Sequence, residues 1–473
     1  MKKILFVVPP QSKEYPEYPH TGIGYLSEYL TKREVQNKVI DMRLGHHIDY
    51  VSEEAEKFKP DFIGVTMVTA GRNEGYKVIN LLKSKGYSIV IGGPHISMLK
   101  SKVLEECNAD FAIKCEGEKP LFELISGKKL EDIKNLIYRK GGKIIENPDR
   151  PFIQNLNALP WPKHEMTELQ KYRGGGVSIV TSRGCPYRCV YCSASLGMGK
   201  GYRARSPKNV IAEIKYWNDK GSKYFHIVDD NFTLDKARVI KLCDFIQKNN
   251  IKATFACDGV RADRVDYEVL KRMKESGFKY LSFGVEGGNN KVLKAIKKGE
   301  TIEQIEKAIK DSIELGFQVY LFFLVGSPKE TVKDVEDSIK LALKYPIAGA
   351  NFYNLVPFPG TELFDYVKKK GNFLIKPEVY LRDAPYYGDS PIFETKEFSK
   401  EERRNALIRT RKIRTIIRRK ILKKRLERFG LLGSFAYIFL KYDFIKEIIV
   451  ERFLVNIPLI RKIIKKKTEE AFI

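Results

Sequence analysis

The stretch Arg183-Gly184-Cys185-Pro186-Tyr187-Arg188-Cys189-Val190-Tyr191-Cys192 places three cysteines at the spacing C-x3-C-x2-C. Three thiolates can hold three irons of a four-iron, four-sulfur cubane, because cysteine is the usual ligand of such clusters. The fourth iron is then free to bind a small molecule. Three core cysteines on one helix face are the alternative, but Gly184 and Pro186 disfavour a regular helix here. The predicted metal ligands are Cys185, Cys189 and Cys192.

This motif, with the aromatic Tyr191 directly before its last cysteine, resembles the signature of the radical S-adenosylmethionine (SAM) superfamily. In that family, SAM chelates the open iron through its amino and carboxylate groups. An electron from the cluster cleaves SAM to a 5′-deoxyadenosyl radical, which abstracts hydrogen from an unreactive carbon. The resemblance therefore implies a [4Fe-4S] cluster and SAM as cofactors, whereas the spacing alone indicates a three-thiolate site.

Residues 1 to 140 alternate short apolar runs with helical patterns. The runs expected as strands are Ile4–Val8, Lys38–Met42, Phe62–Val68, Ser88–Gly92 and Phe111–Lys114, and helices are expected over Ile23–Lys32 and Asn73–Lys85. Strands that alternate with helices predict a doubly wound parallel sheet, Rossmann-like in type. Ligands of such sheets bind at the carboxyl ends of the strands.

Placed before the cysteine motif, this region resembles a cobalamin (B12)-binding domain. The matching features are Pro-Asp-Phe-Ile-Gly-Val-Thr at 60–66, Gly-Gly-Pro-His at 92–95 and Gly117-Glu118. The resemblance implies a cobalamin site at Thr66, Thr69, Gly92, Gly93 and His95. Arg43 stands where the cobalamin signature D-x-H-x-x-G has its axial histidine, so no histidine ligand to cobalt is expected. The alternative is a degenerate α/β domain that only packs on the core.

Residues 176–375 form the expected core, after a proline-rich linker expected over 141–175. The runs expected as strands are Val177–Thr181, Tyr224–Val228, Ala253–Cys257, Tyr280–Val285, Val319–Val325 and Ala350–Leu355, with helical patterns between them. These β/α units predict a partial TIM-like (β/α)6 barrel, with chemistry at the carboxyl ends of its strands.

Polar motifs follow four of these strands at the expected ends. By resemblance to the radical SAM group that carries cobalamin domains, Glu286 and Arg261 would hold polar groups of SAM. Likewise, the 229–231 loop would lie near the SAM amino group and Gly326 near the adenine. The SAM contacts implied in this way are Tyr191, Asp229, Asp230, Asn231, Arg261, Glu286 and Gly326. Each alone is open to a simpler interpretation as a turn or helix cap, and no catalytic residue is assigned.

The net charge of +26 is concentrated in the C-terminal region, expected as basic and helical over 376–473. Residues 401–473 hold 21 basic and 8 acidic residues, half of the total net charge. A basic amphipathic pattern over Glu401–Arg428 suits either a helical cap on the barrel or an anionic membrane surface. The apolar run Leu431–Leu440 is too short to span a bilayer, and Lys462–Lys467 adds further charge. A nucleic acid partner is disfavoured.

The seven cysteines form no disulfide framework, which predicts a reducing compartment. The apolar run Ile4–Val8 is shorter than the about 7–15 residues of a secretory signal core, and it precedes two prolines. We therefore expect a cytoplasmic protein. If the basic C-terminal region binds an anionic membrane surface, the protein would also be peripheral at the membrane.

Four functions are compatible with these features. The first is a cobalamin-dependent radical SAM enzyme that methylates an unactivated carbon of a small-molecule or lipid-like substrate, with a reducing electron donor as partner. The second keeps the cofactors but performs an oxidative cyclisation, or modifies a lipid or tetrapyrrole, without net methyl transfer. A methylthiotransferase is disfavoured, since the N-terminal region has only Cys107 and Cys115 instead of a second triad. A non-enzymatic iron–sulfur protein would normally supply a fourth cysteine ligand.

Overall fold

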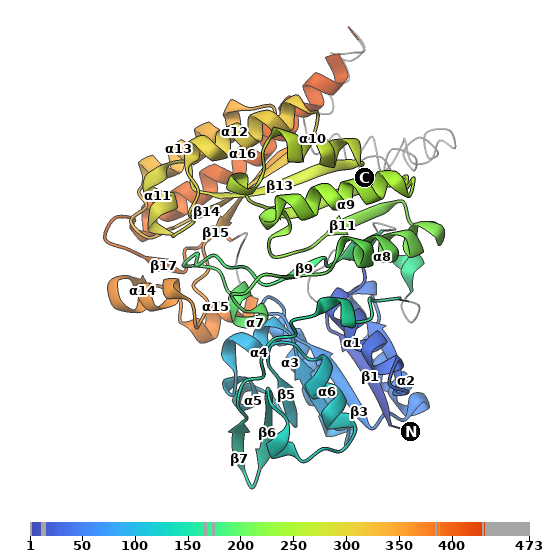
Figure 1. Cartoon of the computed structure of the whole chain (residues 1–473). Helices are drawn as coiled ribbons and strands as arrows, with labels where there is room; N and C mark the ends of the chain where they lie inside the picture. Colours follow the sequence, from blue (N-terminus) through green and yellow to red (C-terminus); the bar gives the residue numbers. More distant parts are fainter. Residues whose placement is uncertain are drawn as a thin grey trace.

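The computed structural model describes residues 2–10, 16–164, 168–172, 176–383, 386, 388–427 and 430. The chain forms two α/β halves, with the N-terminal half in the lower part of Figure 1 and the C-terminal half above it. The N-terminal half is built on a sheet of seven strands, and the C-terminal half on a sheet of six. The α/β architecture expected from the sequence is confirmed.

The N-terminal sheet has the strand order β2-β1-β3-β4-β5-β6-β7. Its strands are β1 (Lys3–Val8), β2 (Gln36–Asp41), β3 (Phe62–Thr66), β4 (Ile89–Gly92), β5 (Phe111–Ile113), β6 (Leu136–Lys140) and β7 (Lys143–Glu146). Neighbours among β1 to β5 pair in parallel, whereas β6 and β7 are antiparallel additions at one edge. The parallel part matches the doubly wound sheet predicted from the sequence.

Helices cover both faces of this sheet. They are α1 (Thr21–Thr31), α2 (Ile48–Phe58), α3 (Arg72–Ser84), α4 (Pro94–Leu99), α5 (Lys102–Glu106) and α6 (Glu118–Ile125). Phe6 packs in the apolar layer that includes residues of α1 and α6, whereas Val7 packs in the layer that includes α2, α3 and α5. Successive residues of a strand point to opposite faces, so β1 contributes to both layers.

One strand lies within the linker that was expected over 141–175. Strand β7 pairs with β6, so the N-terminal sheet continues to Glu146. Gly141 and Gly142 have φ of 56° and 75°, and they close the hairpin in the left-handed region that glycine adopts readily. The two glycines thus form a tight turn within the sheet instead of the start of a linker.

The C-terminal sheet has the order β15-β14-β13-β12-β11-β8, and every neighbouring pair is parallel. Its strands are β8 (Val177–Ile179), β11 (Tyr224–Ile227), β12 (Thr254–Val260), β13 (Phe278–Glu286), β14 (Gln318–Val325) and β15 (Gly349–Asn354). The helices between them are α8 (Pro207–Asp219), α9 (Lys236–Lys248), α10 (Tyr267–Glu275), α11 (Asn290–Ala295), α12 (Ile302–Glu314) and α13 (Val332–Lys344). The predicted series of six β/α units is confirmed.

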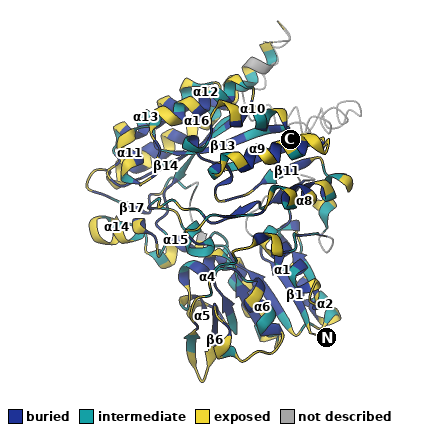
Figure 2. Ribbon diagram, in the orientation of Figure 1, coloured by how far each residue is buried: buried dark blue, intermediate teal, exposed yellow. Residues whose placement is uncertain are grey.

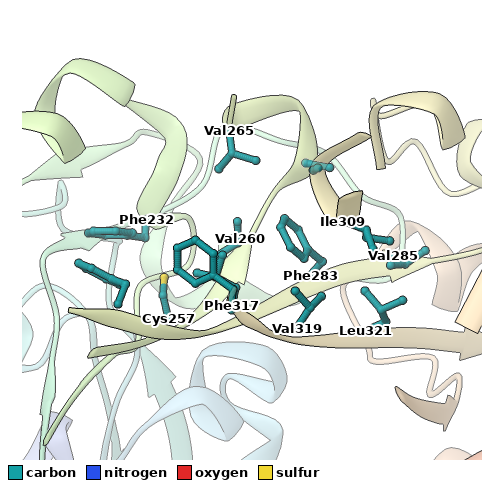
Figure 3. Packing of buried hydrophobic residues seen from close by; sticks show 14 of the residues in the cluster. Phe232, Cys257, Val260, Val265, Phe283, Val285, Ile309, Phe317, Val319 and Leu321 are labelled. Atoms are coloured by element: carbon teal, nitrogen blue, oxygen red, sulfur yellow. The ribbon is translucent and has the colours of Figure 1, made fainter. Parts of the chain in front are cut away.

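The main core lies between this curved sheet and its outer helices. Figure 3 shows Phe283, Val285 and Leu321 among the buried side chains of that layer. Figure 2 shows buried residues along both sheets and exposed residues on the outer helix faces. Because strand side chains alternate, Gly284 and Glu286 face the opposite side, which is the interior of the barrel.

A long helix, α16 (Lys400–Glu427), packs on β15 and α13 and covers the end of the barrel sheet. Its apolar side is buried, with Leu407, Ile413 and Ile417 in the main core. This arrangement agrees with the helical-cap interpretation of the basic segment. The remaining elements of this region are α14 (Glu362–Lys370), β16 (Asn372–Phe373), α15 (Pro377–Asp383) and β17 (Phe393–Glu394).

Among the described residues, no helix combines the length and apolar character needed to cross a bilayer. The apolar run Leu431–Leu440 and the basic run Lys462–Lys467 lie outside the described residues.

Candidate functional site

The three cysteines lie on a loop that leaves β9 (Ser182–Arg183) at the carboxyl end of the barrel. Gly184 opens the loop with φ of 84°, and a Cβ there would lie 2.3 Å from the carbonyl oxygen of Gly201. The loop is anchored further on, since the amide of Val190 donates to the carbonyl of Ile296 at 3.0 Å. The amide of Leu363 donates in turn to the carbonyl of Val190 at 2.9 Å. The loop conformation is therefore determined by backbone contacts.

The cysteine thiols form one group. Surrounding protein raises the pKa of Cys192 to about 11, and Cys189 and Cys185 are among the neighbours that contribute. All three are free thiols, and Cys192 reaches solvent. The Asn231 amide nitrogen lies 4.0 Å from the Cys185 sulfur, and its buried amide oxygen has no hydrogen-bond partner among the residues that the structure describes. Three thiols beside an unsatisfied amide fit a cluster that carries a further polar ligand.

Asp229 and Asp230, expected near SAM, brace the cysteine loop. Asp229 accepts hydrogen bonds from the Thr181 amide at 2.6 Å and from the Ser182 hydroxyl at 2.6 Å. Asp230 accepts one from the Gly184 amide at 2.9 Å. The buried carboxylate of Asp229 is thus engaged by protein groups, and its contact with SAM stays an expectation. Asp230 also lines an open cavity, described below.

Tyr191 and Glu286 meet at the barrel mouth. Burial, and then the nearby Glu286 carboxylate, holds the pKa of Tyr191 well above its ordinary value. Glu286 ends β13 with φ of 66°, an uncommon conformation for a residue with a side chain. Its carboxylate lies 3.3 Å from the ammonium of Lys298. The structure therefore brings two of the expected SAM contacts together and adds Lys298, which sequence reasoning missed.

Arg261 lies beside the cysteine loop but is engaged by protein groups. Its guanidinium donates to Asp263 at 2.9 Å and to the carbonyl of Lys298 at 2.8 Å. It also lies 3.4 Å from the ring centre of Tyr187, within the cysteine loop. The side chain joins this loop to the segment at 298, and its contact with SAM stays an expectation.

Gly326 ends β14 with φ of 108°, and one side of it is filled by Arg403 of α16. A Cβ at Gly326 would lie 1.7 Å from that guanidinium. Arg403 donates to the carbonyls of Val325 and Phe393, and Glu330 accepts from the amides of the 326–327 turn. The glycine is therefore needed for docking of α16, a role that the sequence did not indicate because Arg403 lies 77 positions away.

A cavity of about 1600 Å³, including its open mouth, lies between the two halves of the molecule. From the N-terminal half it is lined by Thr66, Gly92 and Gly93, at the carboxyl ends of parallel strands. From the C-terminal half it is lined by Ser193 and Asp230, beside the cysteine loop. The cavity therefore connects the edge of the sheet with the cysteine loop.

The lining of this cavity fits a bulky group that is largely apolar. Phe6, Val65 and Leu121 contribute apolar surface, and the two glycines allow close approach of the backbone. Gly93 has φ of 109°, and a Cβ there would lie 2.7 Å from the Met67 carbonyl oxygen. Thr66, Gly92 and Gly93, three of the residues expected at a cobalamin site, thus line this cavity.

His95 and Thr69 do not line the cavity. His95 is fully buried on α4, with its Nδ1 3.2 Å from the Thr69 hydroxyl and its Nε2 2.9 Å from the Tyr76 hydroxyl. Burial, with Arg72 nearby, lowers the pKa of His95 to about 3, so the ring is neutral. The two residues bind each other behind the cavity lining, and their contact with cobalamin stays an expectation.

Buried ion pairs join the two halves next to the cavity. Arg183, directly before the cysteine loop, pairs with Glu116 at 3.0 Å and with Glu118 at 2.7 Å. Arg203 pairs with the same Glu116 at 2.7 Å. These carboxylates follow β5 in the N-terminal half, so the network couples the sheet to the cysteine loop. Sequence reasoning missed it, because its partners are distant in the chain.

A polar pair lies inside the barrel. His226 of β11 and Asp258 of β12 alternate with core residues and lie 2.8 Å apart, Nε2 to Oδ2. The Asp258 side chain is 46% exposed although it faces the barrel interior, so the interior is open at this level. Within the described part of the chain, His226 Nδ1 is buried without a hydrogen-bond partner, and the Tyr18 ring lies 5.2 Å away. These groups provide hydrogen-bonding capacity within the barrel.

Comparison with known proteins identifies two family matches. A model described as the radical SAM superfamily matches residues 179–342, and one described as a B12 binding domain matches residues 14–125. An uncharacterized methyltransferase of Pyrococcus horikoshii is 32% identical over 440 residues, which cover 89% of this chain and 94% of that protein. An anaerobic magnesium-protoporphyrin IX monomethyl ester cyclase of Rubrivivax gelatinosus is 26% identical, over 75% of this chain and 67% of that one.

Among solved structures, the fold is similar to that of the radical S-adenosylmethionine methyltransferase TsrM from Kitasatospora setae, which holds cobalamin and a [4Fe-4S] cluster. The TM-score is 0.68 at 21% identity, with 77% of each chain covered. The likeness covers both halves of the fold described above.

Proposed function

The chain belongs to the radical SAM superfamily and contains a B12-binding domain, and from this premise we propose that it methylates an unactivated carbon of a small molecule. It is an enzyme whose cofactors are a [4Fe-4S] cluster, SAM and cobalamin. When bound, these groups supply a 5′-deoxyadenosyl radical that removes hydrogen from the substrate and a methyl group that replaces it. The protein's contribution is to bind, orient and enclose these groups.

One observation carries this proposal. A single cavity is lined both by Gly92 and Gly93 of the N-terminal sheet and by Ser193 and Asp230 beside the cysteine loop. Methyl transfer to a carbon radical requires the methyl source and the site of radical formation to be adjacent. A cobalamin bound at the two glycines would lie next to the cluster loop, so the shape of the cavity supports this chemistry.

We assign the following residues to these groups. The cluster ligands are Cys185, Cys189 and Cys192, and the SAM contacts are Tyr191, Asn231, Glu286 and Asp230. The cobalamin contacts are Thr66, Gly92 and Gly93. The domains are a cobalamin-binding domain over 1–146, a connection over 147–175, a radical SAM core over 176–375 and a basic helical region from 376 onward.

The interior of the barrel favours a polar small molecule as substrate. Asp258 provides an exposed carboxylate at a level where the interior is open. A purely aliphatic lipid chain packed against it would remove water without offering a hydrogen bond, which costs about 1–3 kcal/mol or more for a charged group. The enzyme also requires a one-electron reductant as partner.

Oxidative cyclisation is the second candidate, because the cyclase of Rubrivivax gelatinosus matches 75% of this chain. Both reactions use the same cofactors and begin with the same hydrogen abstraction. They differ in the fate of the substrate radical, which gains a methyl group in one case and forms a ring in the other.

The test is anaerobic reconstitution with iron, sulfide and hydroxocobalamin, followed by mass spectrometry of the products derived from SAM. We expect 5′-deoxyadenosine together with S-adenosylhomocysteine, and a substrate gain of about fourteen mass units. 5′-Deoxyadenosine without S-adenosylhomocysteine would favour cyclisation. Absence of both, in a preparation with a full complement of iron, would contradict the proposal.

Peripheral membrane contact is a separate proposal that concerns the basic side of α16. Lys412, Arg414, Arg418 and Arg419 are exposed, whereas the apolar side of the helix is occupied by the barrel. Contact would therefore be electrostatic, worth about 1 kcal/mol for each basic residue near an anionic surface. Flotation with phosphatidylglycerol vesicles should recover the full chain but not a variant with these four residues changed to glutamine. Equal recovery of both proteins would refute membrane contact through this face.

A further inference from the structure

Lys298 occupies an unusual place for a lysine, inside the mouth of the barrel. Gly284 on the inner side of β13 leaves room for it, since a Cβ there would lie 3.2 Å from the Lys298 ammonium and 2.6 Å from the Glu286 carboxylate. Lys298 is 5% exposed, and its ammonium lies 3.3 Å from Glu286 and 3.4 Å from Glu300. A lysine is rarely buried without such pairing.

The segment around Lys298 is fixed to the cysteine loop by its backbone. The amide of Val190, between Cys189 and Cys192, donates to the carbonyl of Ile296 at 3.0 Å. Arg261 donates to the carbonyl of Lys298 itself at 2.8 Å. The ammonium therefore keeps a constant position relative to the cysteine loop.

The charge of Lys298 lies beside the cysteine loop. Lys298 follows by two residues Ile296, whose carbonyl binds the loop between Cys189 and Cys192. Its ammonium pairs with Glu286, whose carboxylate meets Tyr191 directly before Cys192. Buried charges interact strongly, because the protein around them screens far less than water does. A cluster held by three thiolates becomes more negative when it accepts an electron, and nearby positive charge favours that reduction.

We propose that Lys298 is a positioning residue for reduction of the cluster, and that its buried ammonium raises the reduction potential of the site formed by Cys185, Cys189 and Cys192. The inference rests on the proposed function only in that a cluster is bound by these cysteines. The step concerned is the uptake of one electron from an external reductant, with no bond made or broken. Lys298 also holds the Glu286 carboxylate in place beside Tyr191.

The experiment is an anaerobic redox titration of the reconstituted protein with dithionite, monitored by the EPR signal of the reduced cluster. We expect Lys298→Met to shift the midpoint potential to more negative values. Lys298→Arg, which keeps the charge, should restore most of the wild-type value. Lys297→Met is the matched control, because Lys297 carries the same charge one residue away but is 56% exposed and paired at the surface with Glu362. Water and salt screen that charge, so its removal should leave the potential unchanged.

A second variant covers the case in which Lys298→Met fails to assemble a cluster. Glu286→Gln removes the opposite charge from the same pair, so it should shift the potential to more positive values. Equal midpoint potentials in the wild type, Lys298→Met and Glu286→Gln would overturn the inference, as would a shift of the same sign in both variants. Failure of the wild type to bind a cluster would instead contradict the proposed function.

Discussion

Single residues determine whether the cysteine loop can adopt its shape. Gly184 has a left-handed backbone, and the space where a side chain would begin is taken by the carbonyl oxygen of Gly201. A residue other than glycine would need both a backbone conformation that costs about 1–2 kcal/mol and a displacement of the neighbouring segment. The loop that carries all three ligands therefore depends on this one missing side chain.

We expect Gly184→Ala to fold but to bind less than half of the wild-type iron after reconstitution. Iron and sulfide analysis gives this result, and far-UV circular dichroism verifies the fold. Gly201→Ala is the control, because a Cβ at Gly201 meets no atom within 4 Å. Normal iron content in Gly184→Ala would show that the loop tolerates a side chain at this position.

Buried histidines give the protein a sensitivity to acid. Burial lowers the pKa of His95 to about 3, below the ordinary value of about 6.5. Neutral His95 therefore contributes its full share to the free energy of unfolding above about pH 6.5. This share is lost as the pH falls toward the folded-state pKa, because the unfolded chain binds the proton first. Glu213 and Glu330 have the opposite effect on the free energy of unfolding, because burial raises the pKa of each carboxyl to about 7. Their contribution to stability increases as the pH falls, since the folded chain binds these protons first.

Comparison of the wild type with His95→Gln isolates the contribution of His95 to the pH dependence of stability. Between pH 6 and pH 4, we expect the urea unfolding free energy of the wild type to fall more steeply than that of His95→Gln, by about 1.4 kcal/mol per pH unit. His47→Gln, at an exposed position, should retain the wild-type slope. Equal slopes for all three proteins would mean that His95 is not held neutral by the fold.

At the scale of elements, α16 is a structural part of the barrel and not an appendage. Its apolar residues Leu407, Ile413 and Ile417 enter the main core, and Arg403 reaches the turn after β14. Deletion of residues 401–473 would therefore damage the core itself, so the function of the basic side is better tested by substitutions on its surface.

Two isoleucines of α16 provide a matched test of its docking. Ile413→Ala removes buried apolar atoms and should lower the free energy of unfolding by about 2–4 kcal/mol. Ile416→Ala, at a position that is 38% exposed, should change it by no more than about 0.5 kcal/mol. Chemical denaturation measures both. Similar small effects would indicate that the helix does not pack on the barrel in solution.

For the whole molecule, the decisive feature is the coupling of the two halves. Glu116 accepts from both Arg183 and Arg203, and all three are buried between the sheet and the cysteine loop. The same region borders the cavity assigned to cobalamin. The network therefore links the position of the N-terminal domain to the position of the cluster.

Removal of the shared carboxylate should weaken both docking and cofactor binding. Glu116→Ala leaves Arg203 without its carboxylate partner and Arg183 with Glu118 alone, and loss of one member of a buried pair costs about 3–5 kcal/mol. We expect a lower unfolding midpoint and weaker binding of hydroxocobalamin, measured by absorbance titration. Glu74→Ala, which removes a surface ion pair to Lys77, should alter neither property. Unchanged cobalamin binding in Glu116→Ala would show that the network does not shape the cavity.

Local sequence pattern was sufficient to predict the elements and the loop that carries the three cysteines. The β/α alternation of both halves, the strand positions and the C-x3-C-x2-C loop all follow from neighbouring residues, because apolar periodicity and turn residues act over short distances. The positions of Thr66, Gly92 and Gly93 at the cavity were also predicted, since parallel strands present their carboxyl ends together. The β7 strand was missed because a Gly-Gly turn and a linker have the same local composition.

Only the tertiary structure decided which side chains are available to a cofactor and which are committed to the fold. Asp229, Arg261 and His95 carry the right chemistry at the expected strand ends, yet the structure engages each of them with other protein groups. Lys298, Arg403 and Glu116 matter through partners that lie far away in the chain. Their contacts arise from the packing of whole elements, so no local pattern contains them, and burial then gives those contacts their electrostatic strength.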